Sequence, residues 1–120
     1  MASRPVVLPE HVRELIGILL WKITEADGKY NTRYRTQSAL TCEDRTQLRH
    51  EHVYQRSKMI DALLQAELQD VEQILQSAVA CTVTVQEHLS LNQFDEEYGW
   101  ERYRKAGLVV IDMLNGERFV

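Results

Sequence analysis

The chain has 120 residues, of which 44% are hydrophobic and 27% are charged. These proportions predict a single packed domain spanning residues 1–120 and argue against a disordered chain. Five glycines and two prolines are too few for a long flexible linker.

The first apolar stretch of the chain is interrupted by His11, Arg13 and Glu14. A membrane-spanning helix needs about twenty nearly uninterrupted apolar residues, and a signal peptide needs a cleavage site of small residues. We therefore expect a cytoplasmic protein that makes no contact with a membrane. Cys42 and Cys81 are expected to be free thiols, as lone cysteines in a reducing compartment usually are.

The formal net charge of −4 is distributed unevenly along the chain. Residues 29–58, the basic segment, contain seven Lys or Arg and three Asp or Glu, which gives 7 − 3 = +4. Residues 59–101, the acidic segment, contain nine Asp or Glu and no Lys or Arg. Either the two segments neutralise each other within the fold, or they form two surfaces for different partners, the basic one suited to phosphates.

The first predicted element is a helix over residues 9–26. Apolar residues recur at helical spacing from Val12 to Ile23, and Gly28 supplies a plausible end. Ile18 and Trp21 widen the apolar face beyond one stripe, which indicates a core helix or a homodimer interface.

The next stretch, residues 28–47, shows no sustained period, so it is predicted to be a long loop with a short helical turn near Ser38–Leu40. Residues 48–54 alternate in the manner of a short strand. Helices are then expected after Ser57 and from Asp70.

The remaining elements are two helices and three short strands. A buried strand is predicted at 80–85, followed by a helix opened by a capping box of Thr84 and Glu87. A last helix capped by Asp95 is expected to end at Gly107. Strands at 108–113 and 117–120 are joined through a turn at Asn115-Gly116. The sum is an α+β fold with four or five helices and a small sheet.

His50 and His52 are the first candidate site residues. On a strand they point the same way, about 7 Å apart, so both imidazoles could reach one metal ion if His88, Glu87, Cys42 or Cys81 supplied a further ligand. The alternative is a pair of surface or hydrogen-bonded histidines.

A second pattern joins EHVYQRS (51–57) to VTVQEHLSL (83–91). It resembles HNH-type (ββα-metal) endonucleases, in which an acidic residue precedes a histidine and a later helix carries another histidine. The resemblance implies Glu51 and His88 as metal ligands and His52 as the general base for water. Arg35, Arg49 and Arg56 would hold the nucleic-acid backbone.

A third candidate is KYNTRYR (29–35), where aromatic and basic side chains interleave. This composition suits nucleic-acid contact, a protein interface, or a loop pinned to the acidic segment. The binding residues it suggests, with two further arginines, are Lys29, Tyr30, Arg33, Tyr34, Arg35, Arg49 and Arg56. Trp100 and Tyr103 are expected to be core residues.

Three functional hypotheses follow. The first is a binding or regulatory module that contacts nucleic acid or a protein through the basic segment. Its acidic segment could instead mimic nucleic acid towards a basic partner. The second is an HNH-like metal-dependent nuclease or an inactive descendant, and the third is a subunit that dimerises through helix 9–26. No cofactor is expected, with a divalent metal ion under the second hypothesis as the exception.

Overall fold

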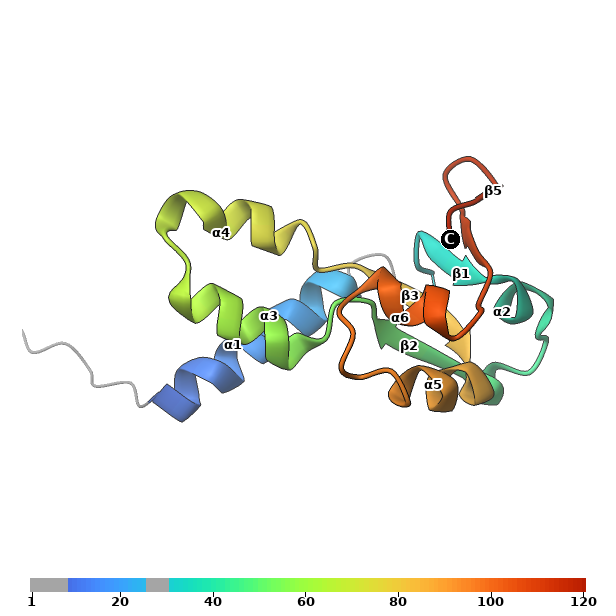
Figure 1. Cartoon of the computed structure of the whole chain (residues 1–120), viewed down its shortest axis with the longest axis horizontal. Coiled ribbons are helices and arrows are strands. Elements are labelled where there is room, and N and C mark those ends of the chain that lie inside the picture. Colours follow the sequence, from blue (N-terminus) through green and yellow to red (C-terminus); the bar gives the residue numbers. More distant parts are fainter. Residues whose placement is uncertain (1–8, 26–30) are drawn as a thin grey trace, which may run out of the picture.

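The computed structural model describes residues 9–25 and 31–120, which form an α+β fold of six α-helices and a five-stranded mixed sheet. Three helices gather at one end of the molecule, and the sheet lies with the other three at the opposite end (Figure 1). None of the helices in the described ranges is long and apolar enough to span a bilayer.

The elements follow one another in a mixed order along the chain. They are α1 (Pro9–Thr24), β1 (Tyr34–Thr36), α2 (Gln37–Thr41), a 3-10 turn (Arg45–Gln47), β2 (Leu48–His52), α3 (Arg56–Gln65), α4 (Leu68–Leu75), β3 (Ala80–Thr84), α5 (Val85–Asn92), α6 (Trp100–Lys105), β4 (Val110–Asp112) and β5 (Glu117–Arg118). The strand order is β2-β3-β1-β4-β5. Only the β1–β3 pair is parallel, and β2 forms one edge of the sheet.

The helical end has a small apolar core of its own. Leu20 of α1 is buried against Met59 and Ile60 of α3, as the apolar spacing of the predicted helix requires. That prediction is confirmed for residues 9–24, while Gly28 lies outside the described residues.

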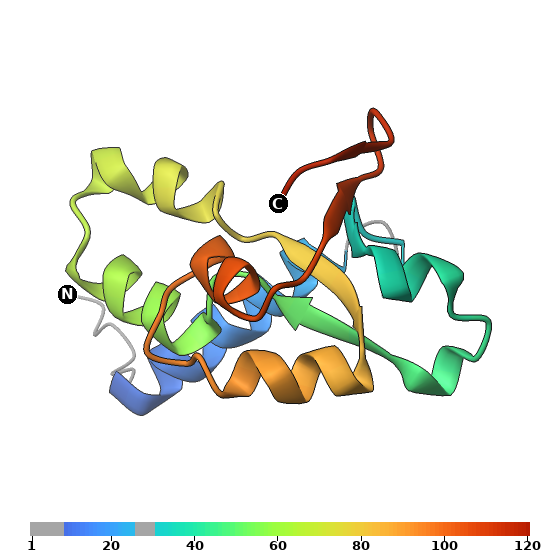
Figure 2. The ribbon, with the colours of Figure 1, turned by 45° about the vertical axis from the view of Figure 1, so that its right-hand side comes forward.

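The main core lies on one face of the sheet, where α5 and α6 cover the strands (Figure 2). Cys81 and Val83 of β3 are fully buried there, together with Leu91 and Tyr103 of the two helices. Trp100 packs against the same cluster, so the prediction of core positions for Trp100 and Tyr103 is confirmed.

Several local signals are confirmed. Thr84 and Glu87 form the expected capping box at the start of α5. The strands around Asn115-Gly116 pair as a hairpin, with Asp112 opposite Glu117. A short helix, α2, covers the turn expected near Ser38–Leu40.

Other predictions were wrong. Residues 28–47 are not one loop, because β1 pairs with both β3 and β4, and these partners come from distant parts of the chain. Helix α4 begins two residues before Asp70 and has no side-chain cap. The last helix begins at Trp100 rather than after Asp95, because Gly99 precedes it with a positive φ of 66° that an α-helix cannot contain.

Candidate functional site at the edge of strand β2

The strand β2 directs its side chains to two sides of the sheet. Leu48, His50 and His52 are buried on one side, while Arg49 is exposed and Glu51 is half-buried on the other, which is the side of α5. This is the alternation expected of a strand. The predicted metal residues His50 and Glu51 therefore leave β2 in opposite directions.

The two histidines of β2 pack under the end of α1. The ring of Trp21 lies 5.3 Å from that of His50 and 5.0 Å from that of His52, measured between centroids. Nε2 of His50 lies 3.0 Å from the hydroxyl of Thr24. Both imidazoles are thus parts of a packed aromatic cluster.

His52 is held in its neutral form by its surroundings. Burial, followed by the charge of Arg56 and by His50, lowers the pKa of His52 from 6.5 to about 4. Its Nε2 is buried without a hydrogen-bond partner. A neutral imidazole with an unused nitrogen is the form that a general base requires.

On the other side of β2, Glu51 meets His88. Oε2 of Glu51 lies 2.5 Å from Nδ1 of His88. His88 belongs to α5, the helix that directly follows the neighbouring strand β3. Glu87 fixes the start of α5, because its carboxylate accepts bonds from the backbone N–H of Thr84 and the hydroxyl of Thr36. The capping box thus places His88 over Glu51.

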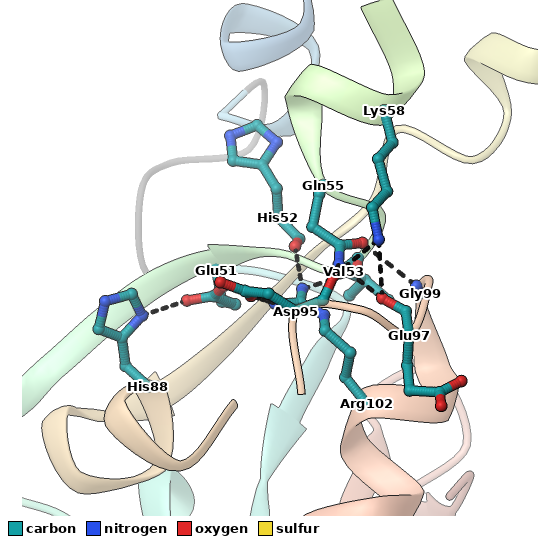
Figure 3. A network of polar contacts seen from close by, with 10 residues as sticks. All are labelled: Glu51, His52, Val53, Gln55, Lys58, His88, Asp95, Glu97, Gly99 and Arg102. Carbon is teal, nitrogen blue, oxygen red and sulfur yellow. Dashed lines mark hydrogen bonds and ion pairs between the residues drawn. The ribbon is translucent and has the colours of Figure 1, made fainter. Parts of the chain in front are cut away.

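Arg102 of α6 contacts both Glu51 and the end of β2. Its side chain is only 2% exposed, and its NH2 group donates to the backbone carbonyls of His52 and Val53, each at 2.9 Å. NH1 lies 3.5 Å from Glu51 and 3.6 Å from Asp95. A buried guanidinium needs such partners, and it anchors both the end of β2 and the carboxylate of Glu51 (Figure 3).

These groups line one polar hollow of about 250 Å³. Its walls are His50, Glu51, His52, Gln55, Arg56, His88, Asn92, Asp95 and Arg102. The hollow therefore collects Glu51, His52 and His88, the three residues that the HNH resemblance singled out. Figure 3 shows His88 beside Glu51, whereas the imidazole of His52 points away from both residues.

Sequence reasoning missed Asn92 and Arg102. Asn92 lies four residues after His88 on α5, so both occur on one face of that helix, and this spacing was a usable signal. No local signal marks Arg102, because charged residues in a helix are usually exposed.

Arg56 and Arg49 are the predicted binding residues nearest the hollow. The guanidinium of Arg56 lies 4.8 Å from the centre of the Trp21 ring and also lines the hollow. Arg49 is exposed and donates to the backbone carbonyls of Thr46 and Leu48. Neither has a carboxylate partner among the residues that the structure describes.

The remaining predicted binding residues lie elsewhere. Tyr34 is a core residue, packed edge-on against Trp100, so its ring is not available to stack on a base. Arg33 makes a bidentate pair with Asp112 at 3.0 and 2.9 Å. Arg35 is half-buried and donates to Asn31. Lys29 and Tyr30 lie outside the described residues.

The ion pairs also bear on the two charged segments. Within residues 9–25 and 31–120, no Lys or Arg of the basic segment pairs with a carboxylate of the acidic segment. The closest approach is Lys58, which donates to the backbone carbonyls of Asp95 and Glu97. Among the described residues, the two segments therefore do not neutralise each other through direct ion pairs.

The donor set of the hollow suits a hard divalent cation. In the described part of the chain, no three His, Cys, Asp or Glu side chains are grouped as a metal cluster. A site here would consist of Glu51 and His88, with Asn92 as a neighbouring oxygen donor. An ion held by these few groups would have to complete its coordination with water, as Mg²⁺ commonly does.

Comparison with known proteins finds no matching family model, no matching curated protein and no matching solved structure. The geometry of the hollow is therefore what indicates a function for this chain.

Proposed function

We propose that the chain binds nucleic acid along the exposed edge of β2, with a backbone phosphate in the polar hollow. The observation that carries the proposal is the position of Arg49 and Arg56, which lie beside the hollow without carboxylate partners among the described residues. Such cations attract the phosphates of a nucleic acid, and their binding releases the counterions that had neutralised those phosphates. The half-exposed imidazole of His88 and the amide of Asn92 add further hydrogen-bonding groups.

A second candidate function is metal-dependent cleavage of the bound strand, in the manner of HNH-type nucleases. It is favoured by one specific arrangement: β2 and β3 are antiparallel neighbours and lead into α5, with Glu51 on the first strand and His88 on the helix. This is a ββα unit, with α3 and α4 inserted between its two strands.

The chain's own residues have distinct roles in that reaction. Glu51 and His88 would hold a divalent ion, which supplies charge neutralisation at the scissile phosphate. His52, neutral near pH 7, would take a proton from the water whose oxygen bonds to phosphorus, while the P–O bond to the leaving sugar oxygen breaks and that oxygen takes a proton from solvent. Because His52 and Glu51 leave β2 on opposite sides, the phosphate would have to lie across the edge of the strand to reach both.

The experiment is fluorescence anisotropy with short single- and double-stranded DNA and RNA, over a salt series, with and without Mg²⁺. We expect binding that weakens as salt is added. Its affinity should fall in Arg49→Glu and Arg56→Glu but not in Arg118→Glu, which lies on the other edge strand, β5. Gel analysis of the same samples separates binding from cleavage. If no nucleic acid binds at low salt, the protein-partner alternative takes its place, and the acidic segment is then the surface to examine.

A further inference from the structure

The outer face of α1, consisting of Leu15, Ile18, Leu19 and Ile23, is apolar and uncovered. These side chains are 56%, 50%, 62% and 45% exposed, respectively. Their spacing of three and four residues places them on one side of the helix. The opposite side of α1 is already occupied by α3, where Leu20 is buried.

The apolar surface continues beyond α1. A hollow of about 280 Å³ between α1, α3 and α4 is lined by Ile16, Leu19, Leu20, Leu63, Val71 and Leu75, all apolar. Leu64 and Leu68 are exposed on the neighbouring helices. A contiguous apolar surface of this kind marks an interaction site more often than scattered exposed residues do.

The charges along α1 identify the occupant. Glu14 and Lys22 are exposed on the outer face, and neither has an ion-pair partner in the described part of the chain. Each lies four residues from Ile18, about 6 Å along the helix axis. The face is therefore negative on one side of Ile18 and positive on the other.

We propose that α1 packs against α1 of a second copy of this chain, antiparallel, about a twofold axis at Ile18. In that alignment residue n lies beside residue 36 − n of the partner, so Glu14 meets Lys22 (14 + 22 = 36) and Ile18 meets Ile18. His11 then meets Glu25 (11 + 25 = 36). A parallel alignment would place Glu14 beside Glu14, and like charges oppose association.

Twofold symmetry makes the interface self-complementary, as isologous dimers require. Each contact of the interface then occurs twice, and Ile18 lies at its centre. None of the residues that line the hollow at β2 belongs to α1, so the two proposals use different residues. The dimer therefore does not depend on the proposed nucleic-acid function.

The test is the mass of the full chain by sedimentation velocity and light scattering from low to ~100 μM protein. We expect twice the chain mass of 14.0 kDa. Ile18→Glu, with Leu15→Glu as a second variant, should weaken the dimer about tenfold or more, because each copy then buries an unpaired charge. Leu114→Glu is the control, since Leu114 is 74% exposed in the distant β4–β5 turn.

The charge pattern gives a sharper readout. Glu14→Lys and Lys22→Glu should each weaken the dimer, and the double variant Glu14→Lys/Lys22→Glu should restore it, since both pairs are then re-formed with reversed sign. Circular dichroism checks that each variant remains folded. A monomer throughout the concentration range, or a double variant no tighter than the single ones, overturns the proposal.

Discussion

Glu51 and His88 meet at 2.5 Å although 37 residues separate them in the sequence. The contact is built by three local features: β2 directs Glu51 towards α5, the Thr84–Glu87 capping box fixes the start of α5, and Arg102 holds Glu51 from below. At this distance the two side chains hydrogen-bond directly, and a carboxylate bonded in this way orients an imidazole ring and leaves its other nitrogen for a ligand.

Metal binding tests this pair directly. Titration of the protein with Mn²⁺, followed by calorimetry, should show one site that is weakened about tenfold or more in His88→Ala and in Glu51→Gln. His11→Ala is the matched control, because His11 is exposed on α1, away from the hollow. Equal affinity in all four proteins would mean that Mn²⁺ binds elsewhere.

The arginines of the basic segment should separate into two groups. Arg56→Glu and Arg49→Glu should lower nucleic-acid affinity and reduce the slope of log K against log salt by about 1 each or more, since each arginine is a proposed phosphate contact. Arg33→Ala should instead lower thermal stability, because it removes the partner of the buried carboxylate of Asp112.

The outcome for Arg33 depends on pH. Its hydrogen bonds lower the pKa of Asp112 below the ordinary value of 3.8. The stabilisation is therefore fully present above that ordinary value and is lost as the pH falls through the lowered pKa. Melting curves of the wild type and Arg33→Ala should converge as the pH falls below 3.8, and a difference that grows towards acid would contradict this assignment.

His52 should make the fold sensitive to mild acid. Its pKa is lowered to about 4 by burial, so folding favours the neutral ring. This stabilisation is complete above the ordinary pKa of 6.5 and is lost as the pH falls from 6.5 towards 4. His52→Gln should flatten the melting temperature over that range. An NMR titration of the His52 ring with a midpoint near 6.5 would show that the ring is not buried as described.

Gly99 is a critical backbone position for the site. It has a φ of 66°, and a Cβ there would lie 2.3 Å from the ring of Tyr54. We expect Gly99→Ala to cost about 2–4 kcal/mol of unfolding free energy, which combines backbone strain with a clash. It should also displace Arg102, three residues later on α6.

Gly107→Ala is the matched control for Gly99. Gly107 has a similar φ of 71°, but nothing lies within 4 Å of its added Cβ. It should cost about 1 kcal/mol, from backbone strain alone. If urea denaturation shows that both variants lose the same free energy of unfolding, a clash with Tyr54 does not contribute to the loss at Gly99.

The sequence predicted those features whose causes are local. The capping box at Thr84, the turn at Asn115-Gly116 and the helix from Pro9 each follow from residues within one or two turns. The three-residue strand β1 was missed because its only evidence is pairing with β3 and β4, which lie far along the chain.

The same distinction between local and long-range causes applies to the candidate site. Alternation on β2 correctly placed His50 and His52 together, but it could not show that Trp21 packs over them. The resemblance joined Glu51 to His88. Arg102 is buried because α6 packs against the sheet. No local sequence pattern predicts that packing.

Cleavage of a labelled oligonucleotide in the presence of Mg²⁺ or Mn²⁺ tests the nuclease proposal most directly. We expect the wild type to produce shorter strands, chelation to stop the reaction, and Glu51→Gln and His88→Ala to lower the rate about a hundredfold or more. His11→Ala should cleave at the wild-type rate. An intact oligonucleotide with the wild type, or unchanged rates in Glu51→Gln and His88→Ala, would contradict a catalytic role for the hollow at the edge of β2.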